Sequence, residues 1–211
     1  MTNPASAAAV TAAPHPSLVS ESGTLAGRLT EAFLSVRAET ERRAAPLSPE
    51  DQLVQSMPDA SPAKWHRAHT TWFWEQFLLG EHSPGYRPYH PDYAYLFNSY
   101  YVSAGPRHAR AQRGHLTRPG AEEVTAYRRH VDAAVVKFFS EADDATLTNL
   151  VSLIEIGLNH EQQHQELMLT DVLHAFAQDL IPPAYDAAWA CPAARADGGE
   201  CGRAESDIRP R

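Results

Sequence analysis

The sequence predicts an all-α fold, a four-helix bundle with one long crossover loop. Three observations predict this class. Apolar residues recur at helical spacing in four long segments, helix start and stop signals flank these segments, and no stretch alternates as a strand would. The connection between the second and third segments, 81–119, is long and has poor helical periodicity. Bundles of this kind commonly build metal sites from inward side chains on facing helices.

The first long helix is expected from about Thr24 to Ala44, because Pro46 cannot continue it. A short helix should follow Ser48, a favourable N-cap residue, and end before Pro58. The apolar stripe of the long helix has the expected i, i+4, i+7, i+8 spacing and consists of Leu25, Leu29, Ala32, Phe33 and Val36.

The second long helix should begin at Ser61-Pro62 and run to about Leu79, with Gly80 as its end. It has one broad face of large side chains, composed of Trp65, His69, Trp72, Phe73, Gln76 and Phe77. This face is expected to be buried. An imidazole in such a place needs a polar partner, because an unpaired buried polar group is destabilising.

The crossover, 81–119, interleaves six tyrosines with proline, glycine, histidine and arginine. Two interpretations remain open. A connection this long inside a compact domain is often functional and is held by its own contacts. Alternatively, the segment merely covers the bundle with aromatic side chains.

The third and fourth helices are expected from about Pro119 to Glu141 and from about Asp144 to Gln178. In the third, the apolar stripe is Val124, Tyr127, Val131, Ala134, Val135 and Phe138. In the fourth, the residues expected to face the core are Leu147, Leu150, Val151, Ile154, Leu158, Leu167, Met168, Val172 and Phe176. Pro182 and Pro183 end the regular region.

Composition limits the classes of function. The net charge of −8 and the isoelectric point near 5.7 argue against non-specific nucleic-acid binding, which requires a basic surface. No apolar run approaches the ~20 residues of a membrane span. The only cysteines, Cys191 and Cys201, form no disulfide framework, so a reducing cytoplasm is expected. Composition also predicts a disordered leader over 1–22, one domain over 23–185 and an irregular tail over 186–211.

The most specific chemical feature is the pair His160 and His164 in the fourth helix. Residues four apart share a helix face, so the two imidazoles should project side by side, as two ligands of one metal ion must. His69 is the candidate third ligand because it lies on the buried face of the second helix, whereas His66 is expected at the boundary of that face. Three nitrogen ligands with open positions are typical of a reactive site, but they do not choose among Zn²⁺, Fe²⁺, Ni²⁺ and Cu²⁺.

The segment 160–164 reads HEQQH, which also matches the H-E-x-x-H pattern of zinc proteases, where the glutamate is the general base. That interpretation needs a third ligand downstream and usually a sheet that holds the peptide. Neither is found: Glu166 and Asp171 lie on the same helix, and Glu200 lies in the tail. Glu161 is therefore expected to support a metal ligand or to lie on the surface.

Three segments carry a resemblance to a known family. They are 61–75 (SPAKWHRAHTTWFWE), 105–110 (GPRHAR) and 157–167 (GLNHEQQHQEL). In this order they resemble the N-terminal part of the ergothioneine-biosynthesis sulfoxide synthases. The resemblance covers roughly 23–185 and implies a DinB-like four-helix bundle.

The resemblance implies a non-haem Fe²⁺ held by His69, His160 and His164. It also implies the reaction, an O₂-dependent formation of a carbon–sulfur bond. A thiol donor, cysteine or γ-glutamylcysteine, would be joined to the imidazole of trimethylhistidine, and the product would be a sulfoxide.

The resemblance further implies substrate-binding residues. Arg107 and Arg110 match the region that binds the carboxylates of the thiol substrate, a role suited to guanidinium groups. The alternative is that both arginines are simply solvated. Gln163 matches a residue that contacts trimethylhistidine.

Members of this family continue into a second domain similar to the formylglycine-generating enzyme, which supplies an active-site tyrosine. No such sequence follows here, so we expect a truncated protein that is inactive alone or works with a separately encoded C-terminal domain. One alternative is a free-standing DinB-like metal-binding module, either a thiol-dependent transferase or a non-catalytic binding protein. A purely structural bundle is a third interpretation, but it leaves the three inward histidines unexplained.

Overall fold

The structure, a computed structural model, describes residues 23–99, 105–181 and 183–186 of the chain. Within these ranges every regular element is helical, which confirms the predicted all-α class. The predicted leader and nearly all of the predicted tail lie outside the described residues. The predicted domain limits therefore stay a prediction.

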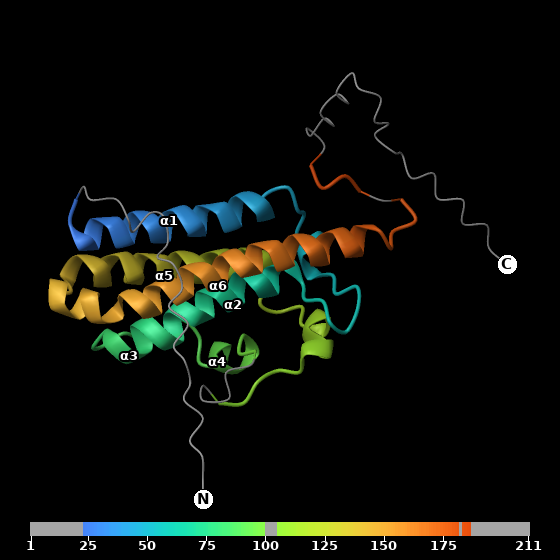
Figure 1. The fold of residues 1–211 in the computed structure, drawn as a ribbon. Helices are drawn as coiled ribbons and strands as arrows, with labels where there is room; N and C mark the ends of the chain where they lie inside the picture. The colour runs from blue at the N-terminus through green and yellow to red at the C-terminus, as the bar shows by residue number, and fades with distance from the viewer. Residues whose placement is uncertain (1–22, 100–104, 182, 187–211) are drawn as a thin grey trace, which may run out of the picture.

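Four long helices lie side by side in Figure 1. They are α1 (Leu25–Ala44), α2 (Ala63–Phe73), α5 (Ala121–Glu141) and α6 (Asp144–Phe176). Helices α5 and α6 each pack against both α1 and α2. This arrangement confirms the four-helix bundle and places α2, which carries His69, against α6, which carries the histidine pair.

The helix starts follow the local signals in the sequence. The side chains of Thr24 and Asp143 accept backbone N–H groups at the beginnings of α1 and α6. The short helix expected after Ser48 is only a single 3-10 turn, η2 (Asp51–Leu53). The helix predicted to continue to Gln178 ends at Phe176.

The second long helix departs from the prediction at its C-terminal end. It continues beyond Phe73 through a π-helical segment, η3 (Trp74–Leu79), and a further turn, α3 (Gly80–His82). Gly80 was predicted to end the helix, but its backbone is right-handed, with φ −61° and ψ −37°. A glycine that caps a helix takes the left-handed conformation instead. Trp74, at the start of the π-helical segment, lies against Gly157 of α6.

The predicted apolar stripes form the core between the helices. Phe33, Trp72, Tyr127 and Ile154 have exposed fractions of 0%. Leu167, also predicted to face the core, is instead 38% exposed. It lies seven residues after His160 and so shares the histidine side of α6, which borders a cleft.

The crossover covers α2 and contains two short helical elements, α4 (Tyr93–Leu96) and η5 (Arg110–His115). The indole N–H groups of Trp65 and Trp72 donate to the carbonyl oxygens of Leu96 and Ala94, at 3.4 and 3.2 Å. The green segment below α2 in Figure 1 shows this placement. The crossover is therefore held by its own contacts, and it also covers the bundle with aromatic side chains.

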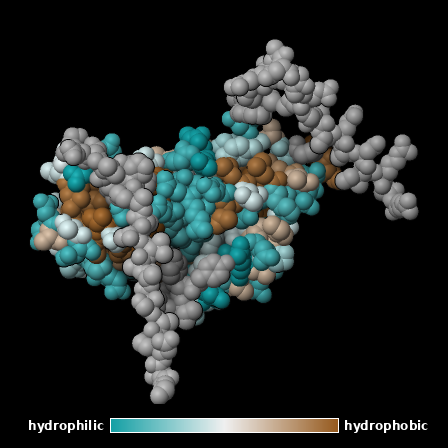
Figure 2. Space-filling view, in the orientation of Figure 1, coloured by the Kyte–Doolittle hydropathy of each residue, from teal (hydrophilic) through white to brown (hydrophobic). Residues whose placement is uncertain are grey.

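The surface of the bundle is mixed in character. In Figure 2 the hydrophilic middle of the visible face separates hydrophobic patches toward its two ends. Exposed large apolar side chains include Ile156 and Leu173, both on α6. Within the described part of the chain, no helix is long and apolar enough to cross a membrane.

Gly157→Ala should lower the free energy of unfolding by about 1–3 kcal/mol, the range for overpacking a buried contact. A Cβ at this position would lie 2.7 Å from two ring carbons of Trp74 and 3.0 Å from Phe73, and these rings are buried. Helix propensity alone predicts the opposite sign, a gain of about 1 kcal/mol.

Urea denaturation measured by circular dichroism distinguishes the two outcomes. Ser152→Ala, at an exposed position of α6, is the control and should change stability by less than about 0.5 kcal/mol. A Gly157→Ala variant as stable as the native protein would show that contact with Trp74 imposes no constraint.

Candidate metal centre

Three histidines from two helices converge at one point of the bundle. The ring centroids of His160 and His164, both on α6, lie 4.6 Å apart. From α2, His69 places its Nε2 3.2 Å from Nε2 of His160 and its ring centroid 4.7 Å from that of His164. Among the residues that the structure describes, this is the one group of His, Cys, Asp or Glu suited to hold a metal ion, with ligand atoms within 4.8 Å of one another.

The orientation of His69 is fixed by its surroundings. Its Nδ1 lies 2.6 Å from the carbonyl oxygen of Phe97 in the crossover. A carbonyl oxygen only accepts, so Nδ1 carries the proton and Nε2 presents its lone pair toward His160. The ring also stacks on Trp65 and Trp72, with centroid distances of 4.5 and 5.4 Å.

Burial keeps the three imidazoles neutral. It lowers the pKa of His69 well below the ordinary value, helped by the neighbouring His160, and it lowers the pKa of His160 to about 4. The pKa of His164 is also lowered, by burial and by the adjacent imidazoles. Neutral imidazole is the form that binds metal ions, so all three nitrogens are available at neutral pH.

The donor set fits a transition metal. Nitrogen ligands about 2.0–2.1 Å from one ion lie roughly 3 Å apart in tetrahedral or octahedral geometry. The separation of 3.2 Å between Nε2 of His69 and Nε2 of His160 agrees with this requirement. Imidazole suits zinc, copper, iron and nickel alike, so the donors define a metal site without selecting its ion.

The histidines border a cleft of about 500 Å³. Two of the residues predicted to bind substrate, Arg110 and Gln163, line this cleft and are exposed. Arg107 is not among the lining residues, and its guanidinium donates to the carbonyl oxygen of Ser99 at 2.8 Å. The structure therefore brings together five of the six predicted site residues, all except Arg107.

Arg113 is a cleft residue that the sequence patterns did not indicate. It belongs to η5, is 4% exposed and lies over the indole ring of Trp65, 3.4 Å from the ring centroid. Its guanidinium donates to Ser61 Oγ at 2.9 Å. Arg113 follows Arg110 by three residues, one turn of the 3-10 helix, but this spacing does not indicate that its side chain meets Trp65.

His66 was expected at the boundary of the buried face, and this expectation is wrong. It is 3% exposed, and its Nδ1 lies 2.8 Å from Nδ1 of His164. The helical pattern of α2 alone could not show this, because it contains no information about the side from which α6 approaches.

One of the two expectations for Glu161, that it lies on the surface, is wrong. It is 0% exposed and accepts hydrogen bonds from Arg37, Arg128 and Thr40, at 3.0, 3.0 and 2.7 Å. Burial raises its pKa, but the two guanidinium groups outweigh burial and lower the pKa to about 2. Both carboxylate oxygens are engaged by residues of α1 and α5, which argues against the protease interpretation of HEQQH.

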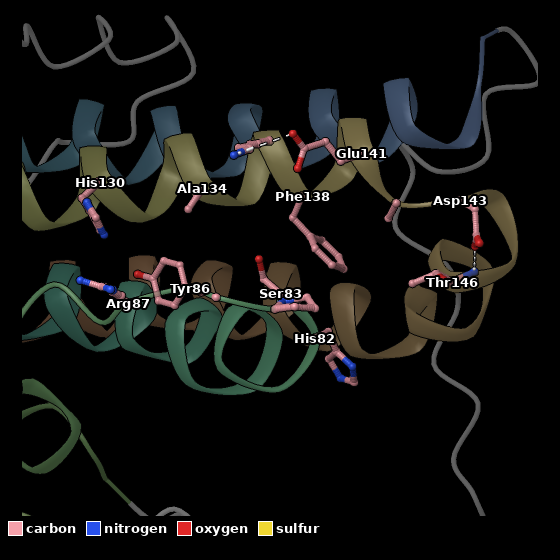
Figure 3. Close-up of a pocket in the computed structure, with 14 residues that line it drawn as sticks. His82, Ser83, Tyr86, Arg87, His130, Ala134, Phe138, Glu141, Asp143 and Thr146 are labelled. Atoms are coloured by element: carbon pink, nitrogen blue, oxygen red, sulfur yellow. Dashed lines mark hydrogen bonds and ion pairs between the residues drawn. The ribbon is translucent and has the colours of Figure 1, made fainter.

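A larger cavity, of about 700 Å³, lies elsewhere in the bundle (Figure 3). It is lined by residues near the end of α5, the beginning of α6 and the start of the crossover, and Figure 3 shows His82 and His130 well separated from one another. None of the three clustered histidines lines it. The candidate metal centre therefore borders the smaller cleft and not this cavity.

Together these features define an all-α bundle whose facing helices present three neutral histidines suited to bind a metal ion. The DinB superfamily matches residues 32–168, well over half of the chain and a range that includes the three histidines. The chain belongs to the DinB superfamily, a metal-binding superfamily. No curated protein matches the chain.

Glu161→Gln should destabilise the protein by about 3–5 kcal/mol, because it removes a fully buried charge that pairs with both Arg37 and Arg128, each of which keeps one other carboxylate. Urea denaturation of the metal-free protein measures the change. Glu166→Gln, at an exposed position of the same helix, should have almost no effect. If Glu161 served only as a catalytic base, its substitution would leave the stability unchanged.

Proposed function

We propose that this protein is the iron-binding domain of an oxygen-dependent sulfoxide synthase of ergothioneine biosynthesis. The observation that carries the proposal is the cluster of His69, His160 and His164 beside a cleft lined by Arg110 and Gln163. The resemblance of three segments to that family supports it. Membership of the DinB superfamily supports a metal site without specifying the ion.

The proposed reaction joins two substrates with one molecule of O₂. The S–H bond of the thiol and a C–H bond of the trimethylhistidine imidazole break, and a carbon–sulfur bond forms. One oxygen atom remains on sulfur as the sulfoxide, and the other leaves as water with both hydrogens. O₂ is the only oxidant that this balance requires. Bound Fe²⁺ supplies the O₂ chemistry, which amino-acid side chains do not provide.

The cleft suits these substrates. Cysteine and γ-glutamylcysteine carry carboxylates, and the guanidinium of Arg110 on the cleft can bind such a group through paired hydrogen bonds. Arg107 is less well placed because it does not line the cleft; the guanidinium groups of both arginines donate to backbone carbonyls, that of Arg107 to Ser99 and that of Arg110 to Asp59. Gln163 lines the same cleft and is exposed, which supports its proposed contact with trimethylhistidine.

The proposal includes a second domain, on the same or on a separate polypeptide, in the reducing cytoplasm. Arg110, Gln163 and Leu167 line the cleft and are exposed, so this side of the site is open to solvent. A domain that covered these residues would exclude water from the reacting groups and complete the substrate pocket.

The three histidines can be tested by metal binding. Replacing His69, His160 or His164 with alanine should lower Fe²⁺ affinity by more than about 100-fold, beyond the loss expected for residues that only support a ligand. Anaerobic equilibrium dialysis followed by elemental analysis measures this. His130→Ala, on the exposed side of α5, should bind Fe²⁺ as the native protein does. If the His69→Ala variant binds as much Fe²⁺ as the native protein, His69 is not the third ligand.

The reaction can be tested by oxygen consumption with trimethylhistidine and each thiol, with the sulfoxide detected by mass spectrometry. The chain alone should show little or no turnover. Adding the purified C-terminal domain of a sulfoxide synthase should produce sulfoxide, and His160→Ala should remain inactive in the same mixture. If the iron-loaded native protein together with the added domain gives no sulfoxide with either thiol, the proposed reaction is wrong.

A free-standing DinB-like metal-binding module is the second candidate, favoured by the superfamily match over the bundle itself. It would act as a thiol-dependent transferase or as a non-catalytic binding protein. This candidate predicts metal binding that depends on the same histidines, but no O₂ consumption with or without the added domain.

A further inference from the structure

A chain of hydrogen bonds leads from the start of α2 through α6 to one of the clustered histidines. The backbone N–H of Ser61 donates to Oδ2 of Asp171, at 2.8 Å. The same oxygen lies 3.0 Å from Nε2 of His66, and Nδ1 of His66 lies 2.8 Å from Nδ1 of His164. Asp171 and His164 belong to α6 and His66 belongs to α2, so the chain joins the two helices twice.

The proton positions along this chain follow from its chemistry. A carboxylate only accepts, so Nε2 of His66 must donate to Asp171. The His66 ring is 3% exposed, and burial disfavours the charged imidazolium form, so its other nitrogen, Nδ1, has a lone pair. That lone pair can accept only from a protonated Nδ1 of His164. The remaining nitrogen of His164, Nε2, is then left without a proton.

We infer that Asp171, acting through His66, selects the tautomer of His164 and thereby makes Nε2 its metal-binding atom. This inference rests on the metal-binding part of the proposed function. Asp171 and His66 are positioning residues, because neither belongs to the group of ligand atoms suited to hold the ion.

Two of the three clustered histidines, His69 and His164, are therefore oriented in different ways. A backbone carbonyl, that of Phe97, fixes the tautomer of His69, and no side-chain substitution removes that acceptor. The tautomer of His164 depends on two side chains, His66 and Asp171. Asp171 is itself held in place by the N–H of Ser61, so the carboxylate does not need to reorganise when a ligand arrives.

The first test measures tautomers in metal-free protein. Long-range ¹H–¹⁵N correlation spectra of histidine-labelled protein distinguish Nδ1–H from Nε2–H imidazoles, and the His164→Gln spectrum assigns the signals of His164. The native protein should show His164 as Nδ1–H and His66 as Nε2–H. A native His164 with its proton on Nε2 would overturn the inference, whatever the variants do.

The second test compares variants and measures their binding of Zn²⁺. Because Zn²⁺ is diamagnetic, the same ¹H–¹⁵N spectra can be recorded for the metal-loaded protein. Asp171→Ala removes the acceptor of His66, and His66→Phe removes the acceptor of His164 while keeping a ring. Both should shift His164 toward Nε2–H and weaken Zn²⁺ binding by about 10- to 100-fold, the usual effect of losing a group that supports a metal ligand. Asp179→Ala, at an exposed position after α6, is the control and should change neither measurement.

The outcomes separate the inference from the proposed function. In the Zn²⁺-loaded native protein, Nε2 of His164 should take a metal-bound chemical shift while Nδ1 keeps its proton. A metal-bound Nδ1, or variants with the native tautomer and affinity, would overturn the inference. If the native tautomers are as expected but neither Zn²⁺ nor Fe²⁺ binds, the metal-binding function itself is wrong.

Discussion

The carboxylate of Glu161, buried between two guanidinium groups, is the interaction on which the geometry of this bundle depends. Arg37 reaches it from α1 and Arg128 from α5, and Arg37 also donates to Thr71 of α2, so one ionic cluster contacts all four long helices. A charge withdrawn from water is strongly destabilising unless it keeps its partners. A rotation of α6 that moved Glu161 away from Arg37 and Arg128 would leave buried charges without partners and is therefore strongly unfavourable. Since Glu161 follows His160 directly and lies about 100° from it around the helix, the same constraint aims His160 at α2.

The histidine cluster is organised by polar groups that lie behind it. Each nitrogen that faces the centre of the cluster belongs to a neutral ring, because burial disfavours the imidazolium form. The orientation of two of the rings comes from outside the cluster, from the carbonyl of Phe97 for His69 and from His66 and Asp171 for His164. These two rings are therefore held by protein groups that lie outside the cluster.

Local patterns in the sequence predicted the helices and the histidine pair, because spacing within one helix determines both. The aromatic face of α2 was predicted to be buried, and this was enough to identify His69 as the candidate third ligand. Arg113 and the true position of His66 depend on how two elements approach one another, which no single helical pattern contains. The same limit explains the error at Leu167, which borders a cleft that the helical pattern could not indicate.

The hydrogen bond from His69 to the Phe97 carbonyl has a consequence for the crossover. A positive ion on Nε2 withdraws electron density from the ring and makes Nδ1–H a stronger donor to that carbonyl. Occupancy at the histidines and order in the crossover then favour one another, and thermodynamic reciprocity requires the two effects to be equal in free energy. The crossover also carries Arg110, so an ion at the histidines would favour order on that side of the cleft as well.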